Sequence, residues 1–109
     1  IIAFGTTQYA IDEARDRLTR TGVHTSFMRL RALPINDEVR DFIASHERVY
    51  VVELNRDGQL HKILQTETPE HAARLVSLAH LDGLPLTARW VVEAIEAAES
   101  QRKEQMSHD

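Results

Sequence analysis

The fold is decided by the stretch Arg48-Val49-Tyr50-Val51-Val52-Glu53-Leu54, which leads directly into Asn55-Arg56-Asp57-Gly58. β-Branched and aromatic residues dominate the first stretch, and such side chains fit the pleated surface of a sheet. The second stretch has turn chemistry, because Asn and Asp bond to nearby backbone and Gly accepts unusual φ values. The sequence therefore predicts a strand that ends in a turn.

Working outward, strand patterns alternate with helical patterns along the whole chain. The expected strands cover residues 1–4, 23–30, 48–54 and 75–79. Helices are expected after Thr6 or Thr7, after the cap Asn36, over 59–65 and after the cap Thr87, with a further helical turn near Pro69. This alternation favours an α/β fold of three layers, a mostly parallel sheet with helices on both faces.

The domain organisation expected is simple. Residues 1–100 match one α/β domain, whose last helix carries an apolar stripe of Trp90, Val91, Ala94, Ile95 and Ala98. Residues 101–109 are polar apart from Met106 and are expected to be a disordered tail. The sequence begins inside a strand without an initiator Met, so we expect one domain of a longer polypeptide.

Composition excludes several classes of function. The 13 Lys and Arg residues against 17 Asp and Glu give a net charge of −4, which argues against binding to nucleic acid. The absence of cysteine excludes disulfides, thiolate metal sites and iron-sulfur ligation within this chain. No apolar run approaches the roughly 20 residues of a membrane span, so neither membrane nor nucleic acid is an expected partner. The expected localisation is cytoplasmic.

Polar residues follow the expected strands, where a parallel sheet binds its ligands at the carboxyl edge. The candidates for an interface or ligand edge are Thr6, Thr7, Glu53, Asn55, Arg56, Asp57, His80 and Asp82. Thr6 and Thr7 suit either an anion site or plain helix capping. Arg56 suits an anionic partner, whereas the residues around it also suit an ordinary turn.

Catalytic and metal-binding patterns are not evident. His80 with Asp82 could form an oriented base, but no nucleophile stands beside it in the sequence, and a structural histidine is the competing interpretation. The six histidines, including His80, show no HExxH motif. We therefore expect no catalytic residue and no metal site in this chain.

Three longer segments carry a resemblance to a known family. They are residues 5–14 (GTTQYAIDEA), 51–60 (VVELNRDGQL) and 82–89 (DGLPLTAR), with 31–34 (RALP) fitting as well. In this order, over about residues 4–95, they resemble the C-terminal domain of the α subunit of 2-oxoacid:ferredoxin oxidoreductases, nearest to the 2-oxoglutarate type. The resemblance implies a transketolase C-terminal-like α/β fold.

The resemblance also implies the chemistry of a parent complex. Such oxidoreductases use thiamine diphosphate with magnesium, an iron-sulfur cluster and coenzyme A, and they produce acyl-CoA, CO2 and reduced ferredoxin. A domain of this kind would be non-catalytic and inactive alone, with no cofactor of its own. Its partners would be the other α-subunit domains, the β subunit and, through the complex, ferredoxin. The alternative function is a stand-alone α/β module that binds a small anionic ligand at the carboxyl edge.

Overall fold

The structure is a computed structural model that describes residues 1–4, 8–30, 36–53, 58–80 and 86–108. Its elements in chain order are β1 (Ile2–Phe4), α1 (Gln8–Arg20), β2 (Met28–Leu30), α2 (Asp37–Ala44), β3 (Val49–Glu53), α3 (Gln59–Glu67), the 3-10 helix η1 (Pro69–Arg74), β4 (Leu75–Ala79) and α4 (Ala88–His108).

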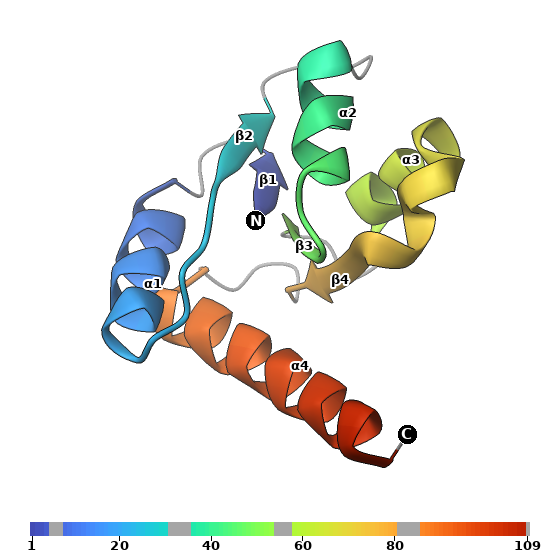
Figure 1. Ribbon diagram of the computed structural model, residues 1–109. Helices are drawn as coiled ribbons and strands as arrows, with labels where there is room; N and C mark the ends of the chain where they lie inside the picture. The colour runs from blue at the N-terminus through green and yellow to red at the C-terminus, as the bar shows by residue number, and fades with distance from the viewer. Residues whose placement is uncertain (5–7, 31–35, 54–57, 81–85, 109) are drawn as a thin grey trace.

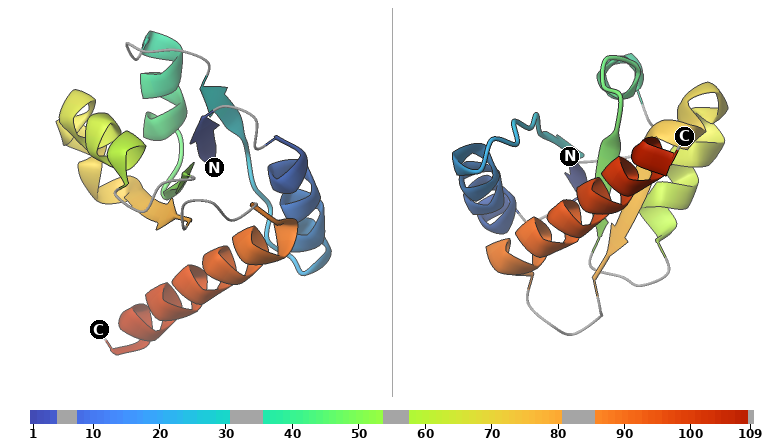
Figure 2. Two further views of the ribbon diagram at one scale, coloured as in Figure 1. Left: turned by 180° about the vertical axis from the view of Figure 1, so that it is seen from behind. Right: turned by 60° about the horizontal axis from the view of Figure 1, so that its bottom comes forward.

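The four strands form one parallel sheet in the order β2-β1-β3-β4. In this order β1 lies between β2 and β3, so the chain moves outward from β1 in both directions. The two hydrophobic faces of the sheet are covered separately: α1 and α4 lie on one face, and α2 and α3 lie on the other (Figures 1 and 2). The predicted three-layer α/β class with helices on both faces is confirmed.

Alternation along β3 sends successive side chains into two different cores. Tyr50 and Val52 face the core that α1 and α4 cover, where Ile11, Leu18, Val91 and Ile95 are buried. Val49 and Val51 face the core under α2 and α3, where Ile43 and Leu64 are buried. The run of β-branched residues predicted the strand, and the structure shows that every residue of β3 is buried.

Local sequence signals set the helix ends. Gly22 follows α1 with a φ of 91°. Hydrogen bonds from Gly22 N to Thr19 O and from Val23 N to Leu18 O complete a Schellman ending. Asn36 Oδ1 accepts from Val39 N at the start of α2, and Thr87 Oγ1 accepts from Trp90 N at the start of α4. Both caps were predicted from the sequence.

Strand β2 is shorter than the expected span of 23–30. Its ladder begins with Met28 opposite Ile2 of β1, so residues 23–27 precede the paired stretch. Arg15 of α1 holds this segment instead, because its guanidinium donates to Thr25 Oγ1 at 3.1 Å and to Thr25 O at 2.9 Å. In part of the predicted span, the Arg15 side chain thus makes hydrogen bonds that a neighbouring strand would otherwise make.

The expected tail at 101–109 is helical instead of disordered as far as His108, where α4 ends. Gln101 and Arg102 are good helix formers, and Arg102 also donates to Glu47 at 3.0 Å. The polar composition therefore indicates that this part of the helix extends beyond the apolar core. It does not indicate where the helix ends.

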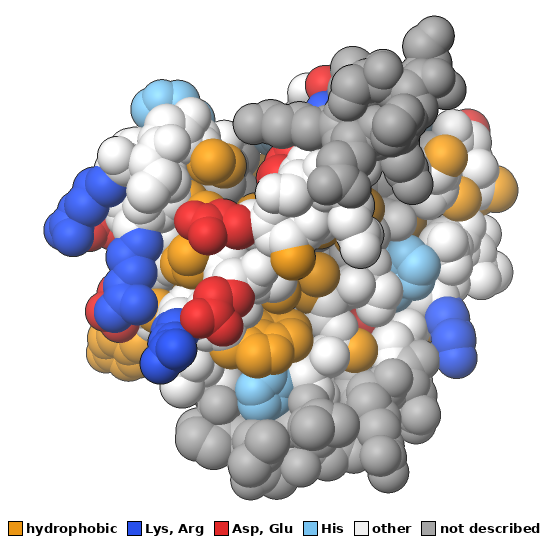
Figure 3. Space-filling view, turned by 90° about the horizontal axis from the view of Figure 1, so that it is seen from below, with side chains coloured by type: hydrophobic (Ala, Val, Ile, Leu, Met, Phe, Trp, Pro, Cys, Tyr) orange, Lys and Arg blue, Asp and Glu red, His pale blue; other side chains and the backbone are white. Residues whose placement is uncertain are grey.

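Trp90 is only half-buried, although the apolar stripe predicted it at the centre of the core. Its ring meets the His80 ring edge-on, with centroids 4.7 Å apart. Hydrophobic side chains are visible among acidic ones on the face seen from below (Figure 3). This agrees with the half-buried state of several residues of β4 and α4: Val76, Leu78, Trp90, Val92 and Ala98.

We predict that Ile95→Ala lowers the free energy of unfolding by about 2–5 kcal/mol, the range for truncating a buried isoleucine. Ile95 has no exposed surface and lies between α4 and the sheet. Ile63→Ala is the matched control, because Ile63 is 36% exposed on α3 and should cost about 1 kcal/mol or less. Urea denaturation of both variants measures the difference, and equal losses would contradict this placement of the core.

Candidate functional site

The candidates taken from the sequence were expected at the carboxyl edge of the sheet, and the structure describes two of them there. Glu53 ends β3, and His80 follows β4, the neighbouring strand. Their backbones are joined by a hydrogen bond from His80 N to Glu53 O at 2.8 Å. The other six candidates lie outside the described residues: Thr6, Thr7, Asn55, Arg56, Asp57 and Asp82.

Glu53 caps the N-terminus of α3 through its side chain. Its carboxylate accepts from Leu60 N at 2.5 Å and from His61 N at 3.1 Å, which are free amides of the first turn. Gly58, the residue before α3, has no side chain to do this. Glu53 is only 6% exposed. Its buried charge is satisfied by the amides of α3 and by the positive end of the helix dipole.

Gly58 is required where Glu53 meets α3. Its φ of +63° is unfavourable for residues with a side chain. A Cβ at this position would also lie 3.2 Å from Ser77 Oγ of β4. The turn signal in the sequence therefore reflects both backbone conformation and the close approach of α3 to the sheet.

His80 is 5% exposed and lies against Trp90 of α4. Its position on the sheet matches that of Val76 and Leu78, which point to the same face. This packing of the imidazole on Trp90 agrees with the interpretation of His80 as a structural residue. It does not orient the ring as a catalytic base. His80 and Glu53 contact each other through backbone, and their side chains lie on opposite faces.

A second polar cluster lies at the opposite, amino-terminal edge of the sheet, and sequence reasoning missed it. Glu99 Oε1 accepts from Arg48 Nη2 at 2.8 Å, from Arg48 Nε at 3.1 Å and from the Tyr50 hydroxyl at 3.0 Å. Glu47 extends the cluster, because it accepts from Arg48 at 3.4 Å and from Arg102 at 3.0 Å. We call these five residues the β3–α4 cluster: Glu47, Arg48, Tyr50, Glu99 and Arg102.

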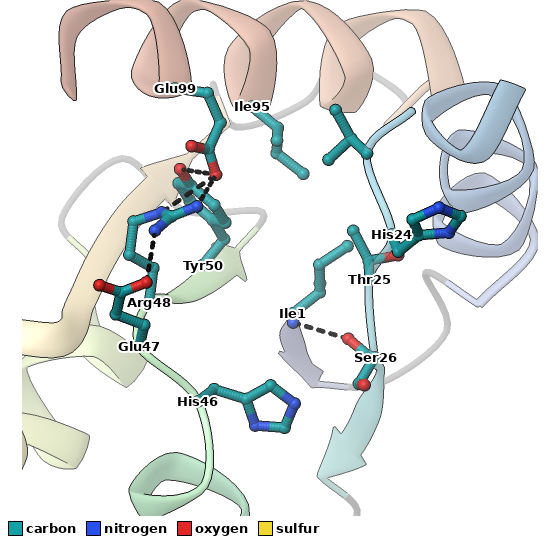
Figure 4. A pocket seen from close by; sticks show the side chains of 11 residues that line it. Ile1, His24, Thr25, Ser26, His46, Glu47, Arg48, Tyr50, Ile95 and Glu99 are labelled. Atoms are coloured by element: carbon teal, nitrogen blue, oxygen red, sulfur yellow. Dashed lines mark hydrogen bonds and ion pairs between the residues drawn. The ribbon is translucent and has the colours of Figure 1, made fainter. Parts of the chain in front are cut away.

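No spacing rule could have found this cluster. Arg48 and Glu99 are separated by 51 residues, and they meet only because α4 crosses the sheet above the start of β3 (Figure 4). The alternation of β3 was the available signal, since it places Arg48 on the same face as Tyr50 and Val52. The alternation indicates the face of the sheet on which Arg48 lies, but it does not indicate that Glu99 is its partner.

The cluster shifts the pKa of two of its members. Burial raises the pKa of the Tyr50 hydroxyl, and the hydrogen bond to the Glu99 carboxylate raises it further. Burial acts to lower the pKa of Arg48, but hydrogen bonds with Glu99 and Tyr50 outweigh it and raise the net pKa. Tyr50 thus remains a neutral donor and Arg48 a cation at neutral pH, which suits a structural network and not acid–base catalysis.

Two hollows flank the β3–α4 cluster. One, of about 200 Å³, lies toward residues 23–26 and is also lined by His24, His46 and Ile95 (Figure 4). The other, of about 400 Å³, lies toward η1 and β4 and is lined by Ala73, Val76 and Ala98. Glu47, Arg48 and Tyr50 line both, so the cluster stands between them.

Within the described residues, no group of three or more His, Asp and Glu side chains is arranged to hold a metal ion. In the same part of the chain, none of the helices combines the length and apolar character needed to cross a bilayer. No protein-family model matches the chain, and no match was found among curated proteins or solved structures.

We predict that Glu53→Gln destabilises the fold by about 1.5–3 kcal/mol, the value of hydrogen bonds to a charged group. The amide keeps the size of the side chain but removes the charge that faces the first turn of α3. Glu70→Gln is the control, because Glu70 is an exposed acid in the first turn of η1. Chemical denaturation measures both, and an equal, small effect would show that the charge at α3 contributes nothing.

We predict a raised tyrosine pKa in the variant Tyr9→Phe, where Tyr50 is the remaining one of the two tyrosines. Ultraviolet absorbance of tyrosinate should give a midpoint above 10, the ordinary value, and Glu99→Gln should move it toward 10. Because the pKa of Tyr50 is raised in the folded state, the contribution of its neutral hydroxyl to stability is complete below about pH 10. That contribution is lost as the pH rises through the pKa of Tyr50 in the folded protein. A midpoint at or below 10 with Glu99 present would contradict the hydrogen-bonded geometry.

Proposed function

We propose that this chain is a non-catalytic structural and assembly domain of the α subunit of a 2-oxoacid:ferredoxin oxidoreductase, of the 2-oxoglutarate type. The domain would lie in the cytoplasm with its complex. It would supply packing surface to other α-subunit domains and to the β subunit. Electron transfer to ferredoxin and formation of acyl-CoA would be properties of the whole complex.

The observation that carries this proposal is where the motifs fall on the sheet. The segments 5–14, 51–60 and 82–89 follow or include the carboxyl ends of β1, β3 and β4. These three strands are neighbours in the sheet. Segments far apart in the sequence therefore leave the sheet at adjacent positions, as expected of motifs that serve one shared surface.

The described candidates support a structural role for this edge. The Glu53 carboxylate occupies the amides at the start of α3, a position where an anionic ligand would otherwise bind. The His80 ring packs on Trp90. These contacts favour an assembly surface over the alternative, a stand-alone module for a small anionic ligand.

Thiamine diphosphate and magnesium do not fit the residues present. Sites of this type in the family use Gly-Asp-Gly followed later by Asn. Here Asp57-Gly58 follows Arg56, and Asp82-Gly83 follows Leu81. The cofactors of the parent complex, including its iron-sulfur cluster and coenzyme A, would therefore be held mainly by other domains, and we assign no reaction step to this chain.

The parentage is tested first by the coding sequence upstream of Ile1. We expect it to encode a pyrimidine-binding α/β domain in the same reading frame, with a β-subunit gene nearby. An initiator Met directly before Ile1 would overturn the proposal. So would turnover of 2-oxoglutarate by the purified chain alone, whereas tight binding of a small anion to it would favour the alternative function.

Arg56 gives the sharper test of assembly. It lies outside the described residues, so the prediction depends on the sequence, where Arg56 follows a strong strand and precedes Asp57-Gly58. A guanidinium can contact a carboxylate or carbonyls of a partner through two donors, which Lys does not reproduce. Arg56→Lys in the complete α subunit should reduce co-purification with the β subunit and leave the stability of the isolated domain within about ±0.5 kcal/mol.

Arg20→Lys is the matched control for that substitution, because Arg20 is exposed at the end of α1 and pairs with Asp16 on the same helix. It should change neither assembly nor stability. Loss of several kcal/mol in Arg56→Lys would place Arg56 in an internal network. Normal assembly with normal stability would make it an ordinary turn residue and remove it from the proposed interface.

A further inference from the structure

We infer that the β3–α4 cluster is an ionic latch: it holds the second half of α4 on the sheet and can release that half while the first half stays docked. This inference concerns a conformational property of the domain and is independent of the proposed function. It rests on the change in contacts along α4, on the two hollows and on the partial exposure of the charges.

The contacts of α4 change character along its length. In the first half, Val91 and Ile95 are fully buried against the sheet and α1. One turn later Ala98 is only half-buried, and the next side chains bond to the start of β3 and to the segment before it: Glu99 to Arg48 and Tyr50, and Arg102 to Glu47. Apolar burial therefore anchors the first half, and charged hydrogen bonds anchor the second.

The hollows lie on both sides of the contacts made by residues 98–102 of α4. Open space of about 200 Å³ lies on one side of the cluster and about 400 Å³ on the other. Arg48 and Tyr50 at the start of β3 bond to Glu99 of α4 (Figure 4), and Arg48 and Tyr50 line both spaces. Release of Glu99 would remove the bridge and join the two hollows into one groove beneath α4.

The charges are exposed enough for solvent and salt to compete with them. The side chain of Glu99 is 18% exposed and that of Arg48 is 27% exposed, while Glu47 at the outer end is 77% exposed. Salt screens the exposed pairs of Glu47 most and the partly buried Arg48–Glu99 pair less, because the Debye length falls from about 30 Å at 0.01 M to about 3 Å at 1 M. The apolar contacts of Val91 and Ile95 are not weakened in this way, so the two halves of α4 should respond differently to salt.

Hydrogen exchange of the intact chain tests the latch, with Glu99→Gln as the variant and Glu96→Gln as the control. Both positions lie on α4, and Glu96 is exposed. In low salt, amides of 98–102 should exchange roughly tenfold faster in Glu99→Gln than in the parent chain, as expected for loss of hydrogen bonds to a charged group. Amides of 91–95 should keep their protection, and Glu96→Gln should change neither segment.

The effect of salt on hydrogen exchange is the second measurement. The pH is held constant because His24 and His46 line the adjoining hollow. About 1 M NaCl should accelerate exchange at 98–102 in the parent chain by less than Glu99→Gln does, because it screens the exposed pairs of Glu47 more than the partly buried Arg48–Glu99 pair. Unchanged protection at 98–102 in the variant would overturn the latch, since apolar contacts would then suffice. Faster exchange across all of α4 and the sheet would overturn it too, because the cluster would then belong to the global core.

Discussion

Burial of β3 on both faces is the constraint on which the rest of the structure depends. The strand lies inside the sheet between β1 and β4, and its side chains contribute to both hydrophobic cores. A parallel strand in this position needs apolar side chains on both faces, and Val49 to Val52 provide them. Its polar residues are confined to the two ends, where the sheet meets the helices.

Those two ends attach two helices on opposite faces. Arg48, just before β3, is directed by the pleat to the face of Tyr50 and bonds to Glu99 of α4. Glu53, at the end of the strand, is directed to the face of Val49 and Val51 and caps α3. The alternation that separates the cores thus also decides which helix each charged end can reach.

Much of the fold was predictable because its signals are local. The β-branched run of β3, the caps Asn36 and Thr87 and the glycine after α1 each act within a few residues. The failures have non-local causes. Residues 23–27 look like a strand but are held by Arg15, and the polar end of α4 remains helical where Arg102 pairs with Glu47. Trp90 lies on an apolar stripe, yet the sheet beneath it covers only part of the ring.

In the candidate site, too, the features set by local sequence could be predicted and those set by distant residues could not. Strand ends are readable from the sequence, so the carboxyl edge could be proposed, and Glu53 and His80 do lie at neighbouring strand ends. Their roles could not be read in the same way, because Glu53 is defined by the amides of α3 and His80 by Trp90. The β3–α4 cluster was invisible for the opposite reason. Its residues have no motif, and their partners are separated by half the chain, so only the crossing of α4 over β3 brings them together.

The two edges of the sheet consequently differ in how firmly their charges are held. At the carboxyl edge, the Glu53 carboxylate is buried against backbone amides, which cannot move without unwinding α3. At the amino edge, Glu99 is held by the side chains of Arg48 and Tyr50, beside open space. Backbone partners fix the position of a carboxylate, whereas side-chain partners near solvent can exchange with water and ions. The described residues thus hold Glu53 at the carboxyl edge by backbone amides, whereas Glu99 at the amino edge is held by side chains alone, which is the contact that we propose can open.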